Sequence, residues 1–219
     1  MFEELKNEIE QNNNIINKLF FGYYFTVYYY NMSKTETETY SFQTESFIKF
    51  DLQKIKQYFF NQKEISILFC FIYYIQTQSN STFYCNNCKK THIGKSNLFL
   101  YRPPKILVII LDRGHGKTFD GETEIEKELD LKPFIYEEIY EYSTSYKLIC
   151  ISTHRGDSSS SGHYTACCLN DNGKYYYFSD SYVNEIKEKD FIRDDPYLLF
   201  YIQYDYNNNN DHFSHKKDN

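Results

Sequence analysis

The sequence lacks any long hydrophobic run and any basic, apolar leader. Its longest apolar stretch, residues 65–75, is too short to cross a bilayer, which takes about 20 residues. The first residues, MFEELKNEIEQ, are acidic and polar, whereas a secretory signal peptide needs a basic and then an apolar segment. We therefore expect no association with a membrane and a cytoplasmic or nuclear location.

Positive charge is also scarce in any one place. The formal net charge is -6, and no run of lysine and arginine is long enough to bind a phosphate backbone. We therefore expect no nucleic acid partner and favour a partner with a basic surface. The 6 cysteines are irregularly spaced. Because no secretory signal accompanies them, we expect reduced thiols rather than disulfides.

The N-terminal half contains several short periodic segments. Residues 2–10 carry apolar side chains at helical spacing. Residues 20–30, FFGYYFTVYYY, are aromatic and β-branched, which predicts a strand. The polar segment 33–39 suits an exposed turn or strand pair. Further expected elements are a strand within residues 41–52 and short helices at 51–61 and 65–77.

The C-terminal half is expected to be rich in strands. Pro103 and Pro104 lack amide donors, which confines them to an edge or a turn. Residues 171–173, Asp-Asn-Gly, are the strongest β-hairpin signal. The tail at 207–219 has too little apolar content to pack, so we expect it to be disordered. The strand-length segments are residues 146–153, 162–169, 174–180 and 197–204.

One histidine stands in a setting suited to chemistry. Gly162 permits close backbone approach to a substrate, and His163 begins a strand beside a Gly/Ser-rich loop. An imidazole there can act as the general base for a thiol if a third group orients its other nitrogen. The hairpin at 171–173 returns the chain toward His163, which makes Asp180 the natural orienting carboxylate. A lone histidine also fits a purely structural role.

Three segments follow one another around this histidine: STHRGDSSSSGHYTACC, NGKYYYFSDSYV and DDPYLLFY. They resemble the C-terminal box of the ubiquitin-specific protease family, with its Gly-His-Tyr-x-Ala, its Gly-Lys-x-Tyr-x-Phe-Asp and its Tyr-x-Leu-Phe-Tyr. Upstream, YRPPKILVIILDRG resembles the family's Leu-Pro-x-x-Leu-x-x-x-Leu-x-Arg segment, and YCNNCKK resembles the second Cys-x-x-Cys of its fingers. The likeness runs in order over about residues 1–204.

The resemblance implies an α+β fold of the papain-like cysteine protease superfamily. A mostly antiparallel palm sheet and β-rich fingers would grip ubiquitin, and a helical thumb, present here only as a remnant, would supply the cysteine. The implied partners are ubiquitin and ubiquitinated proteins. The expected divisions are a partial protease domain at 1–206, comprising thumb helices at 1–19, fingers at 20–96 and palm at 97–206, and a polar tail at 207–219.

The same resemblance implies roles for individual residues. His163 corresponds to the general base, and Asp180 or Ser179 would orient it. The loops at 155–161 and 113–122 would border the channel for the C-terminal tail of ubiquitin. The residues expected to contact that tail are His154, Gly162 and Tyr164.

The sequence departs from the family first at the nucleophile. The chain begins at what resembles the last thumb helix, so the Gly-Asn-x-x-Cys box is expected to be missing. Cys167 and Cys168 lie about 13 Å or more along the strand from His163, whereas a reacting pair needs about 3–3.5 Å. The other cysteines are expected to be buried apolar residues, Cys70 and Cys150, or part of the fingers, Cys85 and Cys88.

Two further departures concern the orienting carboxylate and the metal. Ser179 stands where the family most often has Asp or Asn. A hydroxyl carries no charge, and loss of the triad carboxylate costs about 10⁴ in turnover in a serine protease. We favour Asp180 as its replacement. Structural zinc needs four ligands, and only Cys85, Cys88 and, at a tolerable spacing, His92 are present. We expect no metal and no cofactor.

The first interpretation is therefore a thiol-dependent deubiquitinase that hydrolyses the isopeptide bond after the C-terminal glycine of ubiquitin. It would be represented here without its nucleophile-bearing N-terminal part, so whether this chain is itself an enzyme stays open. The alternative is a catalytically inactive pseudo-protease that only binds ubiquitin. A zinc-ribbon scaffold unrelated to ubiquitin is a third possibility.

Overall fold

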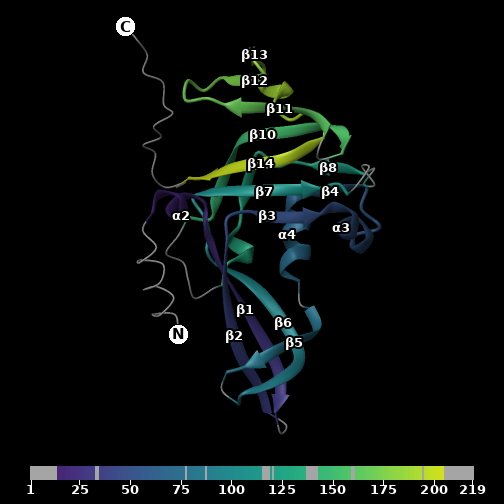
Figure 1. The fold of residues 1–219 in the computed structure, drawn as a ribbon, viewed down its shortest axis with the longest axis vertical. Coiled ribbons are helices and arrows are strands. Elements are labelled where there is room, and N and C mark those ends of the chain that lie inside the picture. The colour runs from purple at the N-terminus through teal and green to yellow at the C-terminus, as the bar shows by residue number, and fades with distance from the viewer. Residues whose placement is uncertain are drawn as a thin grey trace.

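The computed structural model describes residues 14–32, 35–76, 78–86, 88–114, 119, 121–136, 143–158, 161–193 and 195–204. Two sheets dominate them (Figure 1). A four-stranded sheet, the fingers, projects away from an eight-stranded sheet, the palm. The helix expected at residues 2–10 and the tail expected at 207–219 lie outside the described residues.

The palm sheet has the strand order β13-β12-β11-β10-β14-β7-β3, and β9 pairs with β10. Its pairs are antiparallel except β3 with β7, which are parallel. The four strands predicted in the C-terminal half are confirmed as β10, β11, β12 and β14. The bounds are β3 (Ile48–Asp51), β7 (Ile106–Asp112), β9 (Glu128–Asp130), β10 (Ser145–Ser158), β11 (Ser161–Leu169), β12 (Tyr175–Ser179), β13 (Tyr182–Ile186) and β14 (Pro196–Gln203).

The fingers sheet has the order β2-β1-β6-β5, and all of its pairs are antiparallel. The aromatic run at residues 20–30 forms most of β1, which confirms the predicted strand. The Pro103–Pro104 pair lies in the connection between β6 and β7, where missing amide donors cost no ladder hydrogen bond. The bounds are β1 (Gly22–Met32), β2 (Thr35–Glu45), β5 (Gln78–Cys85) and β6 (Lys90–Arg102).

The helices predicted at 51–61 and 65–77 are confirmed in shorter form as α3 and α4. Asp51 caps α3 by accepting a hydrogen bond from the Lys54 amide at 3.0 Å, and Ser66 caps α4 by accepting one from the Phe69 amide at 3.1 Å. Such side chains satisfy amides that have no partner within the helix. The bounds are α2 (Ile15–Phe20), α3 (Leu52–Tyr58), α4 (Ile67–Ile75), β4 (Glu64–Ser66), β8 (Glu122–Glu124), and the 3₁₀ turns η1 (Lys132–Phe134) and η2 (Glu188–Asp190).

The main hydrophobic core lies on the palm face that α3 and α4 cover. Leu107, Ile109 and Leu111 of β7 are buried in alternation, because successive side chains of a strand point to opposite faces. Ile55 of α3 and Phe71 of α4 belong to the same core. This packing holds β7 between β14 and the edge strand β3.

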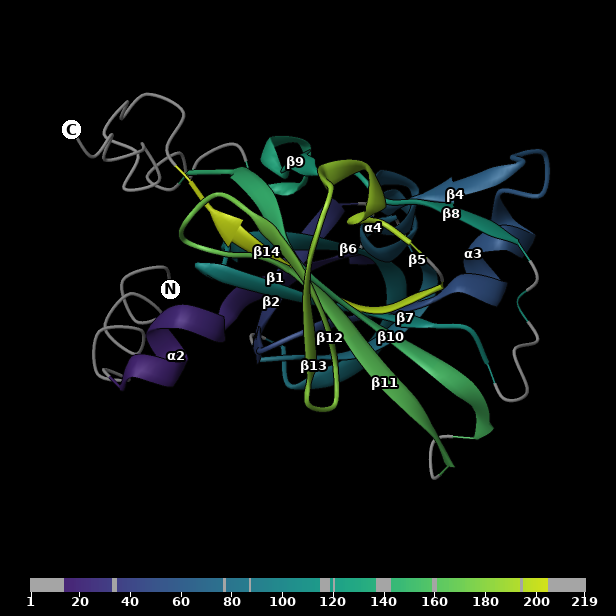
Figure 2. The same cartoon turned by 90° about the horizontal axis from the view of Figure 1, so that it is seen from above.

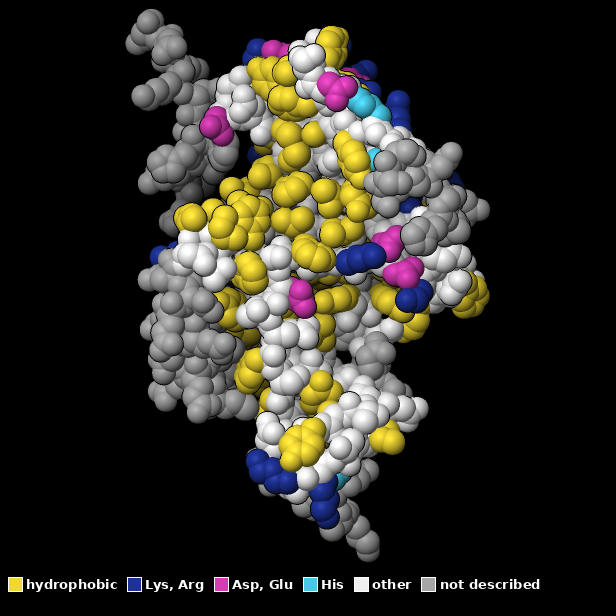
Figure 3. Space-filling model, viewed as in Figure 1, with side chains coloured by type: hydrophobic (Ala, Val, Ile, Leu, Met, Phe, Trp, Pro, Cys, Tyr) yellow, Lys and Arg dark blue, Asp and Glu magenta, His cyan; other side chains and the backbone are white. Residues whose placement is uncertain are grey.

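The opposite palm face is also apolar, and we call it the apolar palm face. It consists of three pairs of directly opposed residues from β7 and β14, each only partly buried. Figure 3 shows a continuous band of hydrophobic side chains over these strands, and in Figure 2 α3 and α4 lie on the other side of the sheet. Exposed apolar patches of this kind mark surfaces that bind other polypeptides. The residues are Ile106, Val108, Ile110, Leu198, Phe200 and Ile202.

Residues 20–96, expected as fingers, divide between the two sheets. β3 pairs with β7 in the palm, and α3 and α4 contribute to the main core. The expected boundary at residue 96 falls within β6, which continues to Arg102. No helix in the described ranges is long and apolar enough to cross a membrane.

Candidate active site

His163 lies near the start of β11, where the loop between β10 and β11 ends. It pairs with Arg155 of β10, and its side chain is about half exposed, at 47%. Two residues further along, the hydroxyls of Thr153 and Thr165 meet across the same strands at 2.6 Å and are buried. This contact holds the backbone beneath the imidazole while the ring itself remains accessible.

The β11–β12 hairpin brings two polar side chains to the imidazole. Its turn uses Gly173 with φ 75, a left-handed conformation that glycine adopts without strain. The Ser179 hydroxyl lies 2.8 Å from His163 Nε2. The Asp180 carboxylate lies 3.8 Å from His163 Nδ1, and its side chain is 82% exposed. Both expected orienting groups are therefore close to the ring, with Ser179 in direct hydrogen-bond contact.

Asp180 is placed by a tight turn. Ser179 pairs with Tyr182 in the β12–β13 hairpin, which leaves two residues to reverse the chain. Asp180 has φ 50, in the left-handed region that Asp and Asn tolerate better than most residues. Turn geometry thus favours a short polar residue here, whatever its role toward His163.

The residues expected to contact a ubiquitin tail form one cluster beside His163. His154 and Tyr164 are opposed across β10 and β11, and their rings lie 4.4 Å apart at 34°. Tyr164 is 48% exposed. A Cβ atom at Gly162 would collide with the His154 imidazole and would lie 2.9 Å from the Arg155 carbonyl oxygen. Only glycine fits there.

The His154 ring packs against the rings of Tyr164 and Tyr197. Its Nε2 atom is buried and has no hydrogen-bond partner among the described residues. A buried polar nitrogen without a partner is costly. The ring therefore occupies a position that the fold imposes.

None of the 6 cysteines lies in position to react with His163. Cys167 and Cys168 follow it by four and five residues on β11, about 13 Å or more by strand rise. Cys150 pairs directly with Cys168 and is equally distant. Cys70 is buried in α4, where burial raises the pKa of its thiol to about 12.

The remaining cysteines lie at the tip of the fingers. Cys85 Sγ lies 3.1 Å from the Tyr30 hydroxyl, a hydrogen bond that raises the tyrosine's pKa to about 12. Cys88 Sγ lies 2.9 Å from His92 Nε2, and the Tyr30 and His92 rings are 4.3 Å apart. Among the described residues no group of three or more histidine, cysteine and carboxylate side chains could hold a metal ion.

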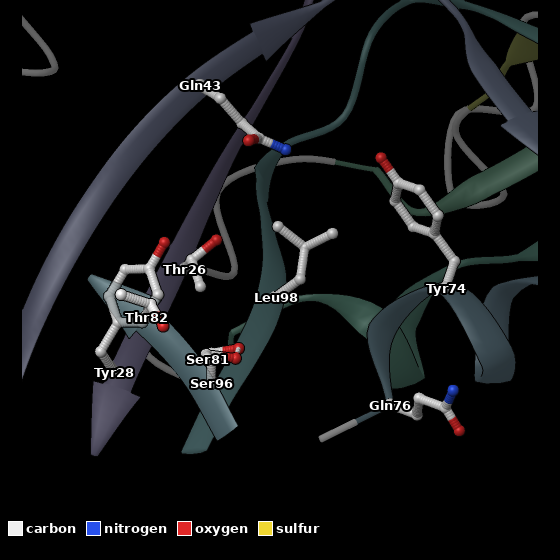
Figure 4. Close-up of a pocket in the computed structure, with 9 residues that line it drawn as sticks. All are labelled: Thr26, Tyr28, Gln43, Tyr74, Gln76, Ser81, Thr82, Ser96 and Leu98. Atoms are coloured by element: carbon white, nitrogen blue, oxygen red, sulfur yellow. Dashed lines mark hydrogen bonds between the residues drawn. The ribbon is translucent and has the colours of Figure 1, made fainter. Parts of the chain in front are cut away.

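A cavity of about 400 Å³ lies elsewhere, between the fingers and α4 (Figure 4). Hydroxyl and amide groups line most of it, and the Ser81 and Ser96 hydroxyls bond to each other at 2.6 Å. It contains no histidine, cysteine or carboxylate, so it does not compete with His163 as a catalytic site. The lining residues are Thr26, Tyr28, Gln43, Tyr74, Gln76, Ser81, Thr82, Ser96 and Leu98.

Sequence patterns did not indicate two sets of long-range hydrogen bonds, those of Arg113 and Glu126. Arg113, at the start of the expected bordering loop, donates to the Pro196 carbonyl at 3.4 Å and to the Thr123 hydroxyl at 3.1 Å. Glu126 accepts hydrogen bonds from the first two amides of α4, at 3.1 and 3.4 Å. Both connect segments far apart in sequence, so no local motif marks them.

The model of the ubiquitin carboxyl-terminal hydrolase family matches residues 2–201. The chain belongs to this family. Among curated hydrolases, it is 30% identical over 126 residues to the mouse ubiquitin carboxyl-terminal hydrolase 17-like protein B, a match covering 56% of this chain and 27% of the relative. It is 33% identical over 121 residues to hydrolase 36 of Drosophila mojavensis, covering 53% of this chain and 10% of the relative.

Solved structures share the hydrolase fold. The Ubp8/Sgf11/Sus1/Sgf73 DUB module of SAGA bound to ubiquitin aldehyde matches with a TM-score of 0.70 at 19% identity, over 93% of this chain and 48% of that one. The same module bound to monoubiquitin matches with a TM-score of 0.68 at 20% identity, over 93% and 47%. The expected α+β fold with palm and fingers is confirmed. The chain spans about half the length of these structures and about a quarter of the mouse relative.

Proposed function

We propose that this chain is the histidine-bearing part of a thiol-dependent deubiquitinase that hydrolyses the isopeptide bond after the C-terminal glycine of ubiquitin. The observation that carries the proposal is the polar arrangement around His163, with Ser179 at 2.8 Å and Asp180 at 3.8 Å from its two ring nitrogens. This arrangement lies on strands of the palm sheet, beside Gly162, where a Cβ atom would collide with the His154 ring and the Arg155 carbonyl oxygen.

In this mechanism His163 takes the proton of a cysteine thiol, and the thiolate attacks the carbonyl carbon of the isopeptide bond. The imidazolium then gives its proton to the departing lysine amine, which leaves an acyl-enzyme. Water, activated by the same imidazole, hydrolyses the thioester and restores the thiol. Ser179 fixes the ring by its hydrogen bond, and the negative charge of Asp180 stabilises the imidazolium.

The nucleophile would come from residues outside this sequence, because none of its cysteines reaches His163. The apolar palm face supports this arrangement, because its side chains stay partly exposed among the described residues and offer a surface for a further helical part of the enzyme. Ubiquitin would lie against the fingers and palm, with its tail passing the cluster of Gly162, His154 and Tyr164. The solved modules bound to ubiquitin aldehyde and to monoubiquitin are consistent with that use of the fold.

The test is complementation. The chain of 219 residues is incubated with a fluorogenic ubiquitin conjugate, alone and with a thumb fragment from a family member that bears the cysteine box. We expect no turnover alone and turnover on complementation. His163→Ala in the complemented enzyme should reduce turnover by about 10²–10⁴-fold or more, the usual contribution of a general base.

Cleavage by the isolated chain that depends on one of its own cysteines would contradict the placement of the nucleophile. A second function, an inactive ubiquitin-binding pseudo-protease, is favoured by Ser179 standing where a carboxylate is usual. It predicts that the complemented protein binds ubiquitin in calorimetry yet stays inactive, with His163→Ala changing nothing.

A further inference from the structure

Two cysteines face each other directly across the palm. Cys150 of β10 and Cys168 of β11 are register partners, and their sulfur atoms lie 2.8 Å apart. Both side chains are partly exposed. Cys150 is also opposite Phe200 of β14, so the pair continues the apolar palm face toward β11. The adjacent Cys167 points to the other face and is buried, at 4% exposure.

The backbone already satisfies the geometry of a disulfide. Directly opposed residues of antiparallel strands have Cα atoms about 4.5–5.5 Å apart, within the range that disulfides span. A covalent S–S bond is about 2.05 Å long, so the sulfur atoms need to move by less than about 1 Å. Neither strand has to shift.

The two thiols differ in acidity in a way that favours reaction. The hydrogen bond between them lowers the pKa of Cys168 and raises that of Cys150, and burial raises the Cys150 value further. The hydrogen bond thus favours Cys168 over Cys150 as the thiolate. A thiolate next to a second thiol is the usual arrangement of a redox-sensitive pair.

We propose that Cys150 and Cys168 form a reversible redox pair that a hydroperoxide converts into a cross-strand disulfide. The Cys168 thiolate attacks the terminal oxygen of the hydroperoxide and the O–O bond breaks, which gives a sulfenic acid and an alkoxide, or hydroxide from hydrogen peroxide. The alkoxide takes up a proton from solvent to give the alcohol, and the hydroxide becomes water. The Cys150 sulfur then attacks the sulfenic sulfur and displaces hydroxide, which takes up the Cys150 proton as water. A dithiol reverses the oxidation by thiol–disulfide exchange.

The disulfide would tie β10 to β11 a few residues from His154 and His163. It would therefore limit the separation of the two strands that frame the candidate active site. This redox chemistry does not depend on the proposed deubiquitinase function, because it requires only the two thiols and an oxidant.

The full chain, freed of reductant, is treated with graded hydrogen peroxide, alkylated and mapped by mass spectrometry. We expect a link between Cys150 and Cys168, a loss of two titratable thiols, and full reversal by dithiothreitol. Amide hydrogen exchange in β10 and β11 should slow in the oxidised form. The proposal is wrong if Cys150 and Cys168 remain free thiols, and are therefore alkylated, at peroxide concentrations that oxidise Cys85 and Cys88.

Matched variants separate this pair from its neighbour. Cys167→Ser should keep the link, whereas Cys150→Ser should abolish it and leave Cys168 as a sulfenic acid that a dione probe traps. If Cys168 still forms a disulfide in Cys150→Ser, its partner is another cysteine and the assignment is wrong. If a variant does not fold, the disulfide mapping of the chain without substitutions still tests the proposal.

Discussion

The palm and the fingers are built from similar antiparallel strands but are stabilised differently. The palm has a second layer, because α3 and α4 cover one face and complete a continuous core. The fingers have two smaller clusters, one around Phe25 and one at the tip around Phe83. A site that needs fixed distances, such as that of His163, is better supported by the layered palm. The fingers are stabilised largely by ring contacts, including those of Tyr136 with Phe25 and Phe99.

The largest effect on stability is expected in the palm core. Leu199 of β14 is fully buried, at 0% exposure, and Leu199→Ala should lower the free energy of unfolding by about 2–5 kcal/mol. For a chain of this size that corresponds to a fall in Tm on the order of 10 °C. Leu198→Ala, the adjacent change on the apolar palm face, is the control and should cost much less. Equal losses of unfolding free energy in the two variants would show that both palm faces contribute equally to stability.

A smaller and local effect is expected at the tip of the fingers. Phe83 stacks on Tyr28 at 4.5 Å and contacts Tyr30 at 5.3 Å, and each such ring pair adds about 0.5–1.5 kcal/mol. Phe83→Ala should speed amide exchange in β5 and the adjoining part of β6 while β7 and β14 keep their protection. Tyr84→Ala, at an exposed neighbour, should change little. Faster exchange throughout the palm would contradict separate stabilisation of the two regions.

The rate of the proposed reaction is expected to depend on the residue at position 179. In the complemented enzyme, Ser179→Asp should raise turnover by roughly tenfold, because charge-assisted hydrogen bonds are about twice as strong as neutral ones. Ser179→Ala should lower it. Asp180→Asn keeps a residue suited to the left-handed turn and removes only the charge, so it isolates the electrostatic part. If Ser179→Ala is silent and Asp180→Asn is not, Asp180 is the principal orienting group.

No effect is expected from removing metal. The tip of the fingers is held by Tyr30, Phe83 and His92 packing around the two cysteines, so chelation should leave Tm unchanged. Atomic emission should find well under one zinc per chain. Stoichiometric zinc that disappears in Cys88→Ser would instead show that the fingers depend on a metal.

Local pattern predicted several elements of each region correctly. The alternation and turn residues of the C-terminal half predicted β10, β11, β12 and β14, and the Asp-Asn-Gly turn predicted that residues near 178–181 return to His163. Pattern did not predict that β3 joins the palm beside β7. That parallel pairing connects segments separated by α3, α4 and the finger strands β5 and β6, and a strand's own residues do not identify so distant a partner.

The sequence by itself determined the family, through motifs such as Gly-His-Tyr, and it determined the strand content, because side-chain alternation and turn chemistry are local properties. Only the tertiary structure decided that Ser179 contacts the imidazole more closely than Asp180 does, and that Cys150 meets Cys168 rather than its neighbour. Both outcomes depend on strand register. A shift of one residue moves every side chain to the other face of the sheet, and the packing of the whole palm sets that register.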